Sequence, residues 1–536
     1  MPPTSPVSRR AVVGTAAWSL PAITVATAAP AMAASGATAL NRTTPVSPMF
    51  TEDMAASQTI SVTLLNGADA VEGAIVGFWL SETTWLRFAA QATTAQVTTD
   101  VDGLAATSLS IAPGASPALG DTATLTASYQ GLLVAWTITY RPFTALATGS
   151  AGAHQLALSG GAAYAWGSGG DGQRGDGTLG AIQSTPVAVT TSGTPMGDKT
   201  LTAISAGDSH SLALASDGAV YAWGRGDSGQ LGNGSTATTT QSTPVAVITS
   251  GTPMADKTIT AIAAGAKHNL ALDSAGAVFA WGRGNGGQIG NGTVPTARTL
   301  PAAVTTAGTP MEGKTITAIA AGTLHNLALD SQGAVYAWGT RSSGRLGNGT
   351  TSGTQSTPVA VTTVGTPMEG KTITAIAAGS AISLAVASDG TVYAWGSGSG
   401  GKLGNGTTTA TQSTPVRVTA VGTPMDGKTI IEVAAGTDHC LALASDGTVY
   451  AWGAGSNGQL GNGTTTAPQS TPVLVTSAGT PMEGKSITTI AAGSFNSYAL
   501  SSDHLAFAWG SATTGALGNG TTAATATTPV KVTVAP

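Results

Sequence analysis

Histidine is the one side chain in this sequence that recurs at equivalent positions and could support metal binding or acid–base chemistry. The equivalent positions hold His154, His210, His268, His325 and His439, and two further copies hold Ile382 and Asn496. An isoleucine side chain cannot bind a metal or carry a proton as an imidazole does. Packed sheets lie about 10 Å apart, so histidines of neighbouring units should not share a metal ion. We therefore expect buried, hydrogen-bonded structural histidines, and we predict neither a metal site nor a cofactor.

Glycine-rich segments match two nucleotide-binding patterns. The phosphate-binding pattern G-x-x-x-x-G-K-[ST] occurs four times, for example at residues 365–372, and residues 224–229 match the dinucleotide pattern G-x-G-x-x-G. Both patterns require a helix directly after the loop, because the helix N-terminus and its amides bind the phosphate. Residues 373–376 instead alternate as a strand does. We interpret both motifs as loops between strands.

Two short motifs match surface signals. The sequence Arg-Gly-Asp-Ser at residues 225–228 is an integrin-type adhesion tetrapeptide, but it occurs in one copy only. Asn-Gly-Thr triplets such as residues 405–407 match a glycosylation acceptor, and in this context we interpret them as turns. No nucleophile–base pair or carboxylate cluster accompanies these motifs. We predict no catalytic residue and do not expect an enzyme.

The elements that carry these residues repeat at a fixed period. The tripeptide Ala-Trp-Gly recurs every 57 or 58 residues. Its tryptophans are Trp166, Trp223, Trp281, Trp338, Trp395, Trp452 and Trp509. Each copy contains four short runs of alternating apolar and β-branched residues, for example residues 372–378, 383–387, 391–395 and 415–419. Seven such copies predict an all-β fold: a seven-bladed β-propeller of four-stranded antiparallel blades over residues 144–536.

The repeat resembles the regulator of chromosome condensation repeat. The sixth copy carries the resemblance in Ala435-Gly436, His439, residues 446–453 and residues 458–463. The resemblance implies a seven-bladed propeller that serves as a binding platform. The founding member of the family exchanges nucleotide on a small nuclear GTPase, and a secreted bacterial relative with shorter repeats inhibits β-lactamases. If the blade border falls inside the repeat, as in such proteins, one blade is built from both ends of the chain.

Residues 1–33 have the pattern of an export signal. Arg9 and Arg10 precede an uncharged stretch that ends in Ala-Met-Ala, which predicts cleavage after Ala33. The paired arginines resemble a twin-arginine signal, and the alternative is an ordinary secretory signal. No other long apolar segment occurs, so we expect no membrane span after cleavage. The single cysteine, Cys440, excludes an intramolecular disulfide.

Residues 34–45 are predicted to be a linker, and residues 46–143 a separate β-sandwich. Three tryptophans in this region, Trp79, Trp85 and Trp136, lie outside the repeat register. Residues 59–64 and 122–127 alternate as strands do. The runs at residues 97–100 and 122–127 resemble bacterial Ig-like domains of the invasin and intimin type. That resemblance implies a spacer or adhesive module at a cell surface.

One face of the predicted propeller varies between copies. It holds the candidate partner-binding residues Arg174, Arg225, Asp227, Arg283, Arg341, Arg345 and Lys402. The opposite face repeats one lysine in each of the six connections between copies, at Lys199, Lys257, Lys314, Lys371, Lys428 and Lys485. Recognition usually resides in variable loops on a constant scaffold, although neutral drift would produce the same pattern.

Composition narrows the function. Charged residues make up 9% of the chain and the net charge is −5, which argues against a nucleic-acid-binding surface. We therefore predict a secreted or cell-surface, monomeric and non-catalytic scaffold that binds a protein partner. The alternatives are an inhibitor of a secreted enzyme and, by family analogy, a guanine-nucleotide exchange factor.

Overall fold

The computed structural model describes residues 143–149, 153–236, 240–466, 468–523 and 525–533, and, between residues 12 and 139, the residues of the strands. The chain divides into two compact units. One unit comprises residues 143–533, and the other comprises residues 1–142 with residues 534–536.

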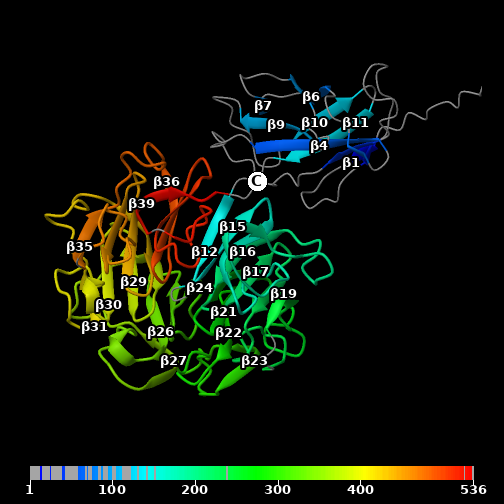
Figure 1. Ribbon diagram of the computed structural model, residues 1–536. Helices are drawn as coiled ribbons and strands as arrows, with labels where there is room; N and C mark the ends of the chain where they lie inside the picture. Colours follow the sequence, from blue (N-terminus) through cyan, green and yellow to red (C-terminus); the bar gives the residue numbers. More distant parts are fainter. Residues whose placement is uncertain are drawn as a thin grey trace, which may run out of the picture. The chain divides into compact units, whose positions relative to one another are not determined.

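The larger unit is a ring of seven four-stranded antiparallel sheets (Figure 1). Blade 1 contains β12 (Phe143–Thr148), β13 (His154–Ser159), β14 (Ala162–Gly169) and β15 (Gly180–Ala188). Blade 2 contains β16 (Leu201–Ala206), β17 (His210–Ala215), β18 (Val220–Gly224) and β19 (Gln241–Ala246). Blade 3 contains β20 (Ile259–Ala264), β21 (His268–Asp273), β22 (Val278–Arg283) and β23 (Ala297–Ala303). Blade 4 contains β24 (Ile316–Ala321), β25 (His325–Asp330), β26 (Val335–Thr340) and β27 (Thr354–Ala360).

The remaining three blades follow the same order. Blade 5 contains β28 (Ile373–Ala378), β29 (Ile382–Ala387), β30 (Val392–Gly396) and β31 (Gln412–Arg417). Blade 6 contains β32 (Ile430–Ala435), β33 (His439–Ala444), β34 (Val449–Gly453) and β35 (Gln469–Leu474). Blade 7 contains β36 (Ile487–Ala492), β37 (Asn496–Ser501), β38 (Ala506–Gly510) and β39 (Ala526–Lys531). Two short 3-10 turns, η2 (Ser342–Gly344) and η3 (Ser399–Gly401), lie in the loops of blades 4 and 5.

The prediction of seven four-stranded blades is confirmed, but no blade is shared by the two ends of the chain. Every blade consists of four consecutive strands, so β12 belongs to the first blade and β39 to the last. The ring closes instead by contact between these two complete blades, because β12 lies against β36 and β37. Each border between blades therefore lies between the fourth strand of one blade and the first strand of the next, for example between β27 and β28.

The core consists of layers between neighbouring blades. Second strands are buried along their whole length, whereas fourth strands are half-exposed. Between blades 4 and 5, for example, Leu327 and Val335 pack with Ile373, Ala385 and Trp395. Each buried aliphatic side chain contributes about 1.5–3 kcal/mol. Because a blade has such a layer on both sides, no blade can bury its apolar residues alone.

The smaller unit contains two sheets. One has the order β1 (Val12–Gly14), β11 (Leu132–Thr139), β10 (Thr122–Tyr129), β6 (Ile75–Ser81) and β8 (Thr94–Thr98). The other has the order β2 (Thr24–Val25), β3 (Ala39–Arg42), β4 (Gln58–Asn66), β9 (Leu104–Ile111) and β7 (Leu86–Phe88), and β5 (Asp69–Ala70) pairs with β4.

The sheets of the smaller unit contain the strands expected from the sequence at residues 59–64 and 122–127. In β6, Val76, Phe78 and Leu80 are buried, as alternate residues of a sheet covered on one face should be. β1 and β2 fall within the predicted export signal, and β1 pairs with β11 in parallel. The Ig-like assignment stays a prediction. In the described residues, no helix is long and apolar enough to cross a membrane.

Candidate protein-binding face

The up-and-down order of the strands gives the propeller two different faces. The turns after the first strands, such as residues 207–209, and the long loops after the third strands, such as residues 284–296, form what we call the loop face. The turns between second and third strands and the connections between blades form the lysine face. The chain enters β12 at the lysine face, where His504 Nδ1 lies 3.1 Å from the carbonyl oxygen of Phe143.

The seven repeated tryptophans join each blade to the loop of the preceding blade. All seven are fully buried, and each indole Nε1 donates a hydrogen bond of 2.8–3.1 Å to a loop carbonyl. The donor–acceptor pairs are Trp223–Gln173, Trp281–Gln230, Trp338–Gln288, Trp395–Arg345, Trp452–Lys402, Trp509–Gln459 and, closing the ring, Trp166–Ala516. We call each pair a joint. The loops of the loop face are therefore also the parts that hold the ring together.

A glycine next to each joint lets the loop approach the indole. At Gly232, φ is +64°, a left-handed conformation that suits glycine. A Cβ atom at Gly232 would also lie only 2.9 Å from Trp281 Nε1. The first glycine of the Leu-Gly-Asn-Gly sequence is thus required by the joint, independently of any ligand.

The repeated histidines add a second contact to five of the joints. Each is completely buried, and its Nε2 lies 2.6–2.8 Å from a serine or asparagine on the second strand of the next blade. The pairs are His154–Ser211, His210–Asn269, His268–Asn326, His325–Ser383 and His439–Ser497. Burial lowers the pKa of His154 to about 3 and the pKa of His210, His268 and His439 to about 4. These imidazoles are neutral at pH 7, and the expectation of structural histidines is confirmed.

The two copies without histidine have altered partners as well. Ile382 lies at the joint where the next blade carries Cys440 in place of serine or asparagine, and both are fully buried. Burial also raises the pKa of the Cys440 thiol to about 12. At the ring closure, Asn496 donates to the carbonyl of Ser511, and Tyr498 Oη donates to Ala516 at 2.8 Å. At the joint of Ile382 and Cys440 both members of the polar pair are therefore replaced, whereas at the ring closure Asn496 bonds within its own blade.

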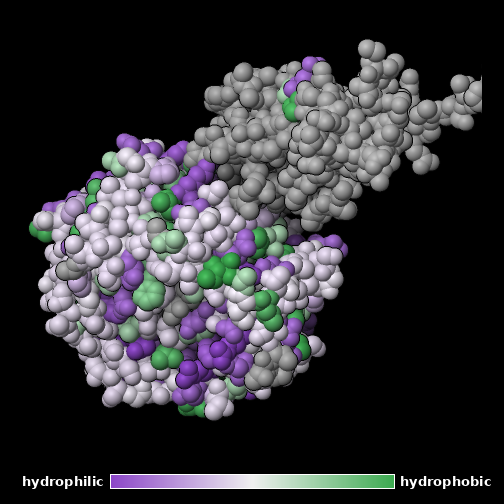
Figure 2. Space-filling view, viewed as in Figure 1, coloured by the Kyte–Doolittle hydropathy of each residue, from purple (hydrophilic) through white to green (hydrophobic). Residues whose placement is uncertain are grey.

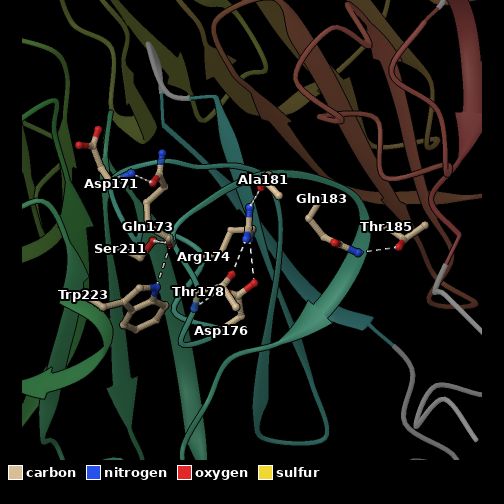
Figure 3. A network of polar contacts seen from close by, with 10 residues as sticks. All are labelled: Asp171, Gln173, Arg174, Asp176, Thr178, Ala181, Gln183, Thr185, Ser211 and Trp223. Atoms are coloured by element: carbon tan, nitrogen blue, oxygen red, sulfur yellow. Dashed lines mark hydrogen bonds and ion pairs between the residues drawn. The ribbon is translucent and has the colours of Figure 1, made fainter. Parts of the chain in front are cut away.

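Arg174, one of the predicted binding residues, is buried within its own loop (Figure 3). Its Nε donates to Asp176 Oδ2 at 2.9 Å, and its Nη2 to Thr178 Oγ1 at 2.7 Å. Burial alone would raise the pKa of the Asp176 carboxyl, but hydrogen bonds from Thr178 and Arg174 outweigh it and lower that pKa. Arg174 occupies the position that Leu231 fills in blade 2, so a buried ion pair replaces a buried leucine.

Arg345 and Lys402 are buried as well and tie their loops to the next blade. Arg345 Nη1 donates to the carbonyl of Ser380 at 3.0 Å, and Lys402 Nζ lies 3.0 Å from Asp438 Oδ1. Their own carbonyls accept the indole hydrogen bonds of the joints. The prediction that Arg174, Arg345 and Lys402 bind a partner assumed that these side chains are exposed, but all three are buried. Their hydrogen bonds hold the loops and joints of the ring in place.

The remaining four candidates lie at the surface of the loop face in blades 2, 3 and 4. Arg225 and Asp227 pair at 2.7 Å with side-chain exposures of 44% and 23%. Arg283 donates to Asn285, and Arg341 donates to Gln355. The structure thus brings Arg225 and Asp227 together, whereas Arg283 contacts its own loop and Arg341 contacts β27 of its own blade.

Lys267 is a surface residue of this face that sequence reasoning missed. Its Nζ lies 3.4 Å from Asp227 Oδ2, which makes a charged cluster of Arg225, Asp227 and Lys267 across blades 2 and 3. Lys267 belongs to a turn after a first strand, where the equivalent residues include Ser209, Ala381 and Phe495. Variation in that turn was the signal that could have revealed it.

Apolar side chains also reach the surface of the loop face. Leu179, Ile182, Val294 and Phe495 are 59%, 49%, 50% and 44% exposed. Figure 2 shows that, on the visible side of the molecule, apolar residues form small separate spots among polar ones. The loop face thus combines a charged cluster with isolated exposed apolar side chains.

Family models match most of the propeller. Residues 294–535 match the RCC1-like domain, and residues 160–214 and 217–272 match the regulator of chromosome condensation (RCC1) repeat. The RCC1 domain-containing protein RUG3, mitochondrial, of Arabidopsis thaliana is 32% identical over 335 residues, which cover 61% of this chain and 69% of RUG3. The ultraviolet-B receptor UVR8 of the same plant is 35% identical over 48% of this chain and 54% of the receptor. Human E3 ubiquitin-protein ligase HERC2 is 35% identical over 55% of this chain but only 6% of the ligase.

Solved structures show the same fold. Prp20p from Saccharomyces cerevisiae, which has binding properties to Gsp1p and histones, is 24% identical with a TM-score of 0.59, over 69% of this chain and 85% of that chain. Human WBSCR16 is 20% identical with a TM-score of 0.57, over 70% of this chain and 91% of that chain. At these identities the similarity concerns the fold and not the partners.

Proposed function

Since this chain belongs to the RCC1 repeat family, we propose that its propeller is a non-catalytic platform that binds a protein partner through the loop face. The proposal rests on one observation. Arg225, Asp227 and Lys267 form a charged cluster at the surface of the loop face, whereas the repeated tryptophans are buried in the joints between blades. The relative Prp20p, which binds Gsp1p and histones, supports a protein as the class of partner. The buried, neutral histidines support a role without catalysis, because they are held in structural hydrogen bonds.

We further propose that the protein is exported and works outside the cytoplasm or at the cell surface. The residues that support export are Arg9, Arg10 and the Ala-Met-Ala sequence that ends at Ala33. In this proposal, residues 46–143 are an Ig-like spacer.

Reversing charge on the loop face should weaken partner capture. A triple variant with Arg225→Glu, Arg283→Glu and Arg341→Glu should lose about tenfold in affinity, since arginines are frequent hot spots of protein interfaces. The measurement is quantitative capture from culture medium of the source cells, with the purified propeller as bait. A matched variant with Lys199→Glu, Lys257→Glu and Lys428→Glu changes the net charge equally on the other face and should capture normally. Loss of capture in the lysine variant alone would place the interface on the lysine face and contradict the prediction. A captured, stoichiometric enzyme that loses activity would identify an inhibitor.

Export should depend on the paired arginines. A variant with Arg9→Lys and Arg10→Lys should remain inside the cell, because the twin-arginine route requires both guanidinium groups. The measurement is the fraction of protein in the medium, together with the N-terminal sequence of the exported chain, which should begin at Ala34. The same change at Arg298 serves as the control and should leave export unchanged. Normal export of the double variant would exclude the twin-arginine route.

A further inference from the structure

Three equivalent pockets open on the lysine face, each at the end of one blade and the start of the next. The pockets of blades 2, 4 and 5 have volumes of about 280, 410 and 370 Å³. Each is lined by the turn between the second and third strands, by the end of the fourth strand and by the Pro-Met connection to the next blade. Because the three pockets are built from the same elements, differences between them come from single residues.

In blades 2 and 5, an aspartate of the turn holds the lysine that precedes the first strand. Lys199 pairs with Asp217 at 2.6 Å, and Lys371 pairs with Asp389 at 2.7 Å. Asp217 and Asp389 line the pockets of their own blades, whereas Lys199 and Lys371 do not line those two pockets. Lys257 also lines the pocket of blade 2, and Arg417 and Lys428 also line that of blade 5, so both pockets contain basic side chains together with carboxylates.

Blade 4 lacks this aspartate, as does blade 3, where Ala275 stands at the same position. Its turn reads Asp330-Ser331-Gln332-Gly333, where blade 5 has Ala387-Ser388-Asp389-Gly390. Asp330 is buried and accepts hydrogen bonds from the amides of Gln332 and Ala334 and from Tyr336 Oη at 2.8 Å. In blade 4 the acidic residue therefore stands two positions earlier in the chain than in blade 5. It lies at the buried end of β25 and accepts hydrogen bonds from the turn.

Because Gln332 stands where blade 5 has Asp389, Lys314 lacks the aspartate partner that Lys371 has. Lys314, the equivalent of Lys371, has no ion pair among the described residues, and it lines the pocket of blade 4. Lys371 lines the same pocket from the next blade, with its ammonium group paired to Asp389. No carboxylate belongs to the lining, so the pocket has one uncompensated positive charge.

The rest of the lining is apolar or neutral. Val335, Val361, Met368 and Ile373 belong to the lining, each at most 5% exposed, and the amide side chain of Gln332 lies at the turn. A volume of about 410 Å³ is within the usual range of small-ligand pockets. An apolar wall beside one free ammonium group fits a ligand with a short aliphatic body and one carboxylate.

We propose that the pocket of blade 4, lined by Lys314, Gln332, Val361, Met368 and Lys371, binds a short aliphatic carboxylate. Lys314 Nζ donates to the carboxylate, and the aliphatic body packs on Val361 and Met368. The carboxylate belongs either to a free acid or to the C-terminal residue of a peptide. This site lies on the face opposite the proposed partner surface and does not depend on it.

The test uses two pairs of probes with the full-length mature chain. The first pair is 4-methylpentanoate and its amide, and the second is acetyl-glycyl-leucine and its amide. Affinities are measured by saturation-transfer NMR titration at low salt. We expect at least one free carboxylate to bind at least about tenfold more tightly than its amide, since a tenfold change corresponds to about 1.4 kcal/mol. Binding of the free acid only identifies a small-molecule site, and binding of the peptide only identifies a chain terminus.

Two variants and one control make the assignment specific. Gln332→Asp installs the acid found in blades 2 and 5, and Lys314→Gln removes the ammonium group. Each should weaken carboxylate binding about tenfold. Ala275→Asp adds the same charge at the equivalent turn of blade 3 and should have no effect, as should the loop-face triple variant. Melting temperatures of all variants verify folding. Equal binding of acids and amides, no binding of either acid, or equal losses with Ala275→Asp and Gln332→Asp would overturn the proposal.

Discussion

Acidification from pH 6.5 to pH 4 should unfold the propeller through its five buried histidines. Burial lowers the pKa of His154 to about 3 and that of His210, His268 and His439 to about 4, and it lowers the pKa of His325 well below its ordinary value. In the unfolded chain these groups titrate at 6.5. Below pH 6.5 the unfolded state therefore binds protons that the folded state does not, and stability falls as pH falls.

The expected loss is large. Each histidine lowers the free energy of unfolding by about 1.4 kcal/mol per pH unit between its two pKa values. Since domains are stable by only about 5–15 kcal/mol, a loss of about 14 kcal/mol from five such groups over two pH units is comparable to the whole stability of a domain. The measurement is urea denaturation at a series of pH values from 7.5 to 4.5, followed by tryptophan fluorescence.

One joint of the ring provides a control for the prediction that acidification unfolds the propeller. The joint of Ile382 and Cys440 has no histidine, so the double variant His154→Ile and Ser211→Cys copies an existing joint. That variant should reduce the pH slope by about 1.4 kcal/mol per pH unit. A slope that does not change, or a parent protein whose stability is independent of pH in this range, would contradict the prediction.

Removal of Thr528–Pro536 should open the ring. The segment includes most of β39, and Val532, which is buried, packs beside Gly518 near the indole of Trp166. The amide of Thr533 donates to the carbonyl of Gly518 at 2.7 Å. Without these contacts the closing loop is anchored at one end only, and the joint of Trp166 with Ala516 loses its support. We expect a loss of about 5 kcal/mol or more, from one buried valine and several backbone hydrogen bonds.

The comparison for the truncation is deletion of one whole interior blade, residues 373–429. That deletion removes 57 residues but leaves the first and last blades complete, and Trp452 would meet the loop of Arg345 instead of the loop of Lys402. We expect the short truncation to lower the melting temperature more, or to cause aggregation through the exposed edge of β38. Equal or greater damage from the blade deletion would show that closure does not depend on β39.

Most of the fold could be predicted from the repeat period of the sequence. The regular tryptophans and the Gly-rich turns were sufficient to predict seven blades of four strands, because each repeat forms one closed unit of hydrogen bonding. The conditional expectation of a shared blade was wrong, since the border between repeats depends on packing between blades and not on strand propensity. In β12 and β39, both ends of the chain complete their own sheets.

The candidate site was harder to predict because exposure was inferred from charge. Arg174 stands at the position of Leu231, and Arg345 and Lys402 stand at the position of the buried Gln230. An alignment of the copies would have indicated burial at these positions. The pocket of blade 4 could not be found in that way, because it depends on an ion pair between residues 18 positions apart, seen in Lys371 and Asp389 and absent at Lys314.

The joints also have a direction, which sets an order of assembly during synthesis. Each indole finds its acceptor in the blade already made: Trp223 can donate to Gln173 as soon as blade 2 emerges, and each later blade repeats this step. Trp166 alone must wait, because its acceptor, Ala516, lies 350 residues downstream. On the ribosome the protein thus grows as an open arc with one unsatisfied indole at its leading edge. The ring becomes complete only after the last blade has left the exit tunnel.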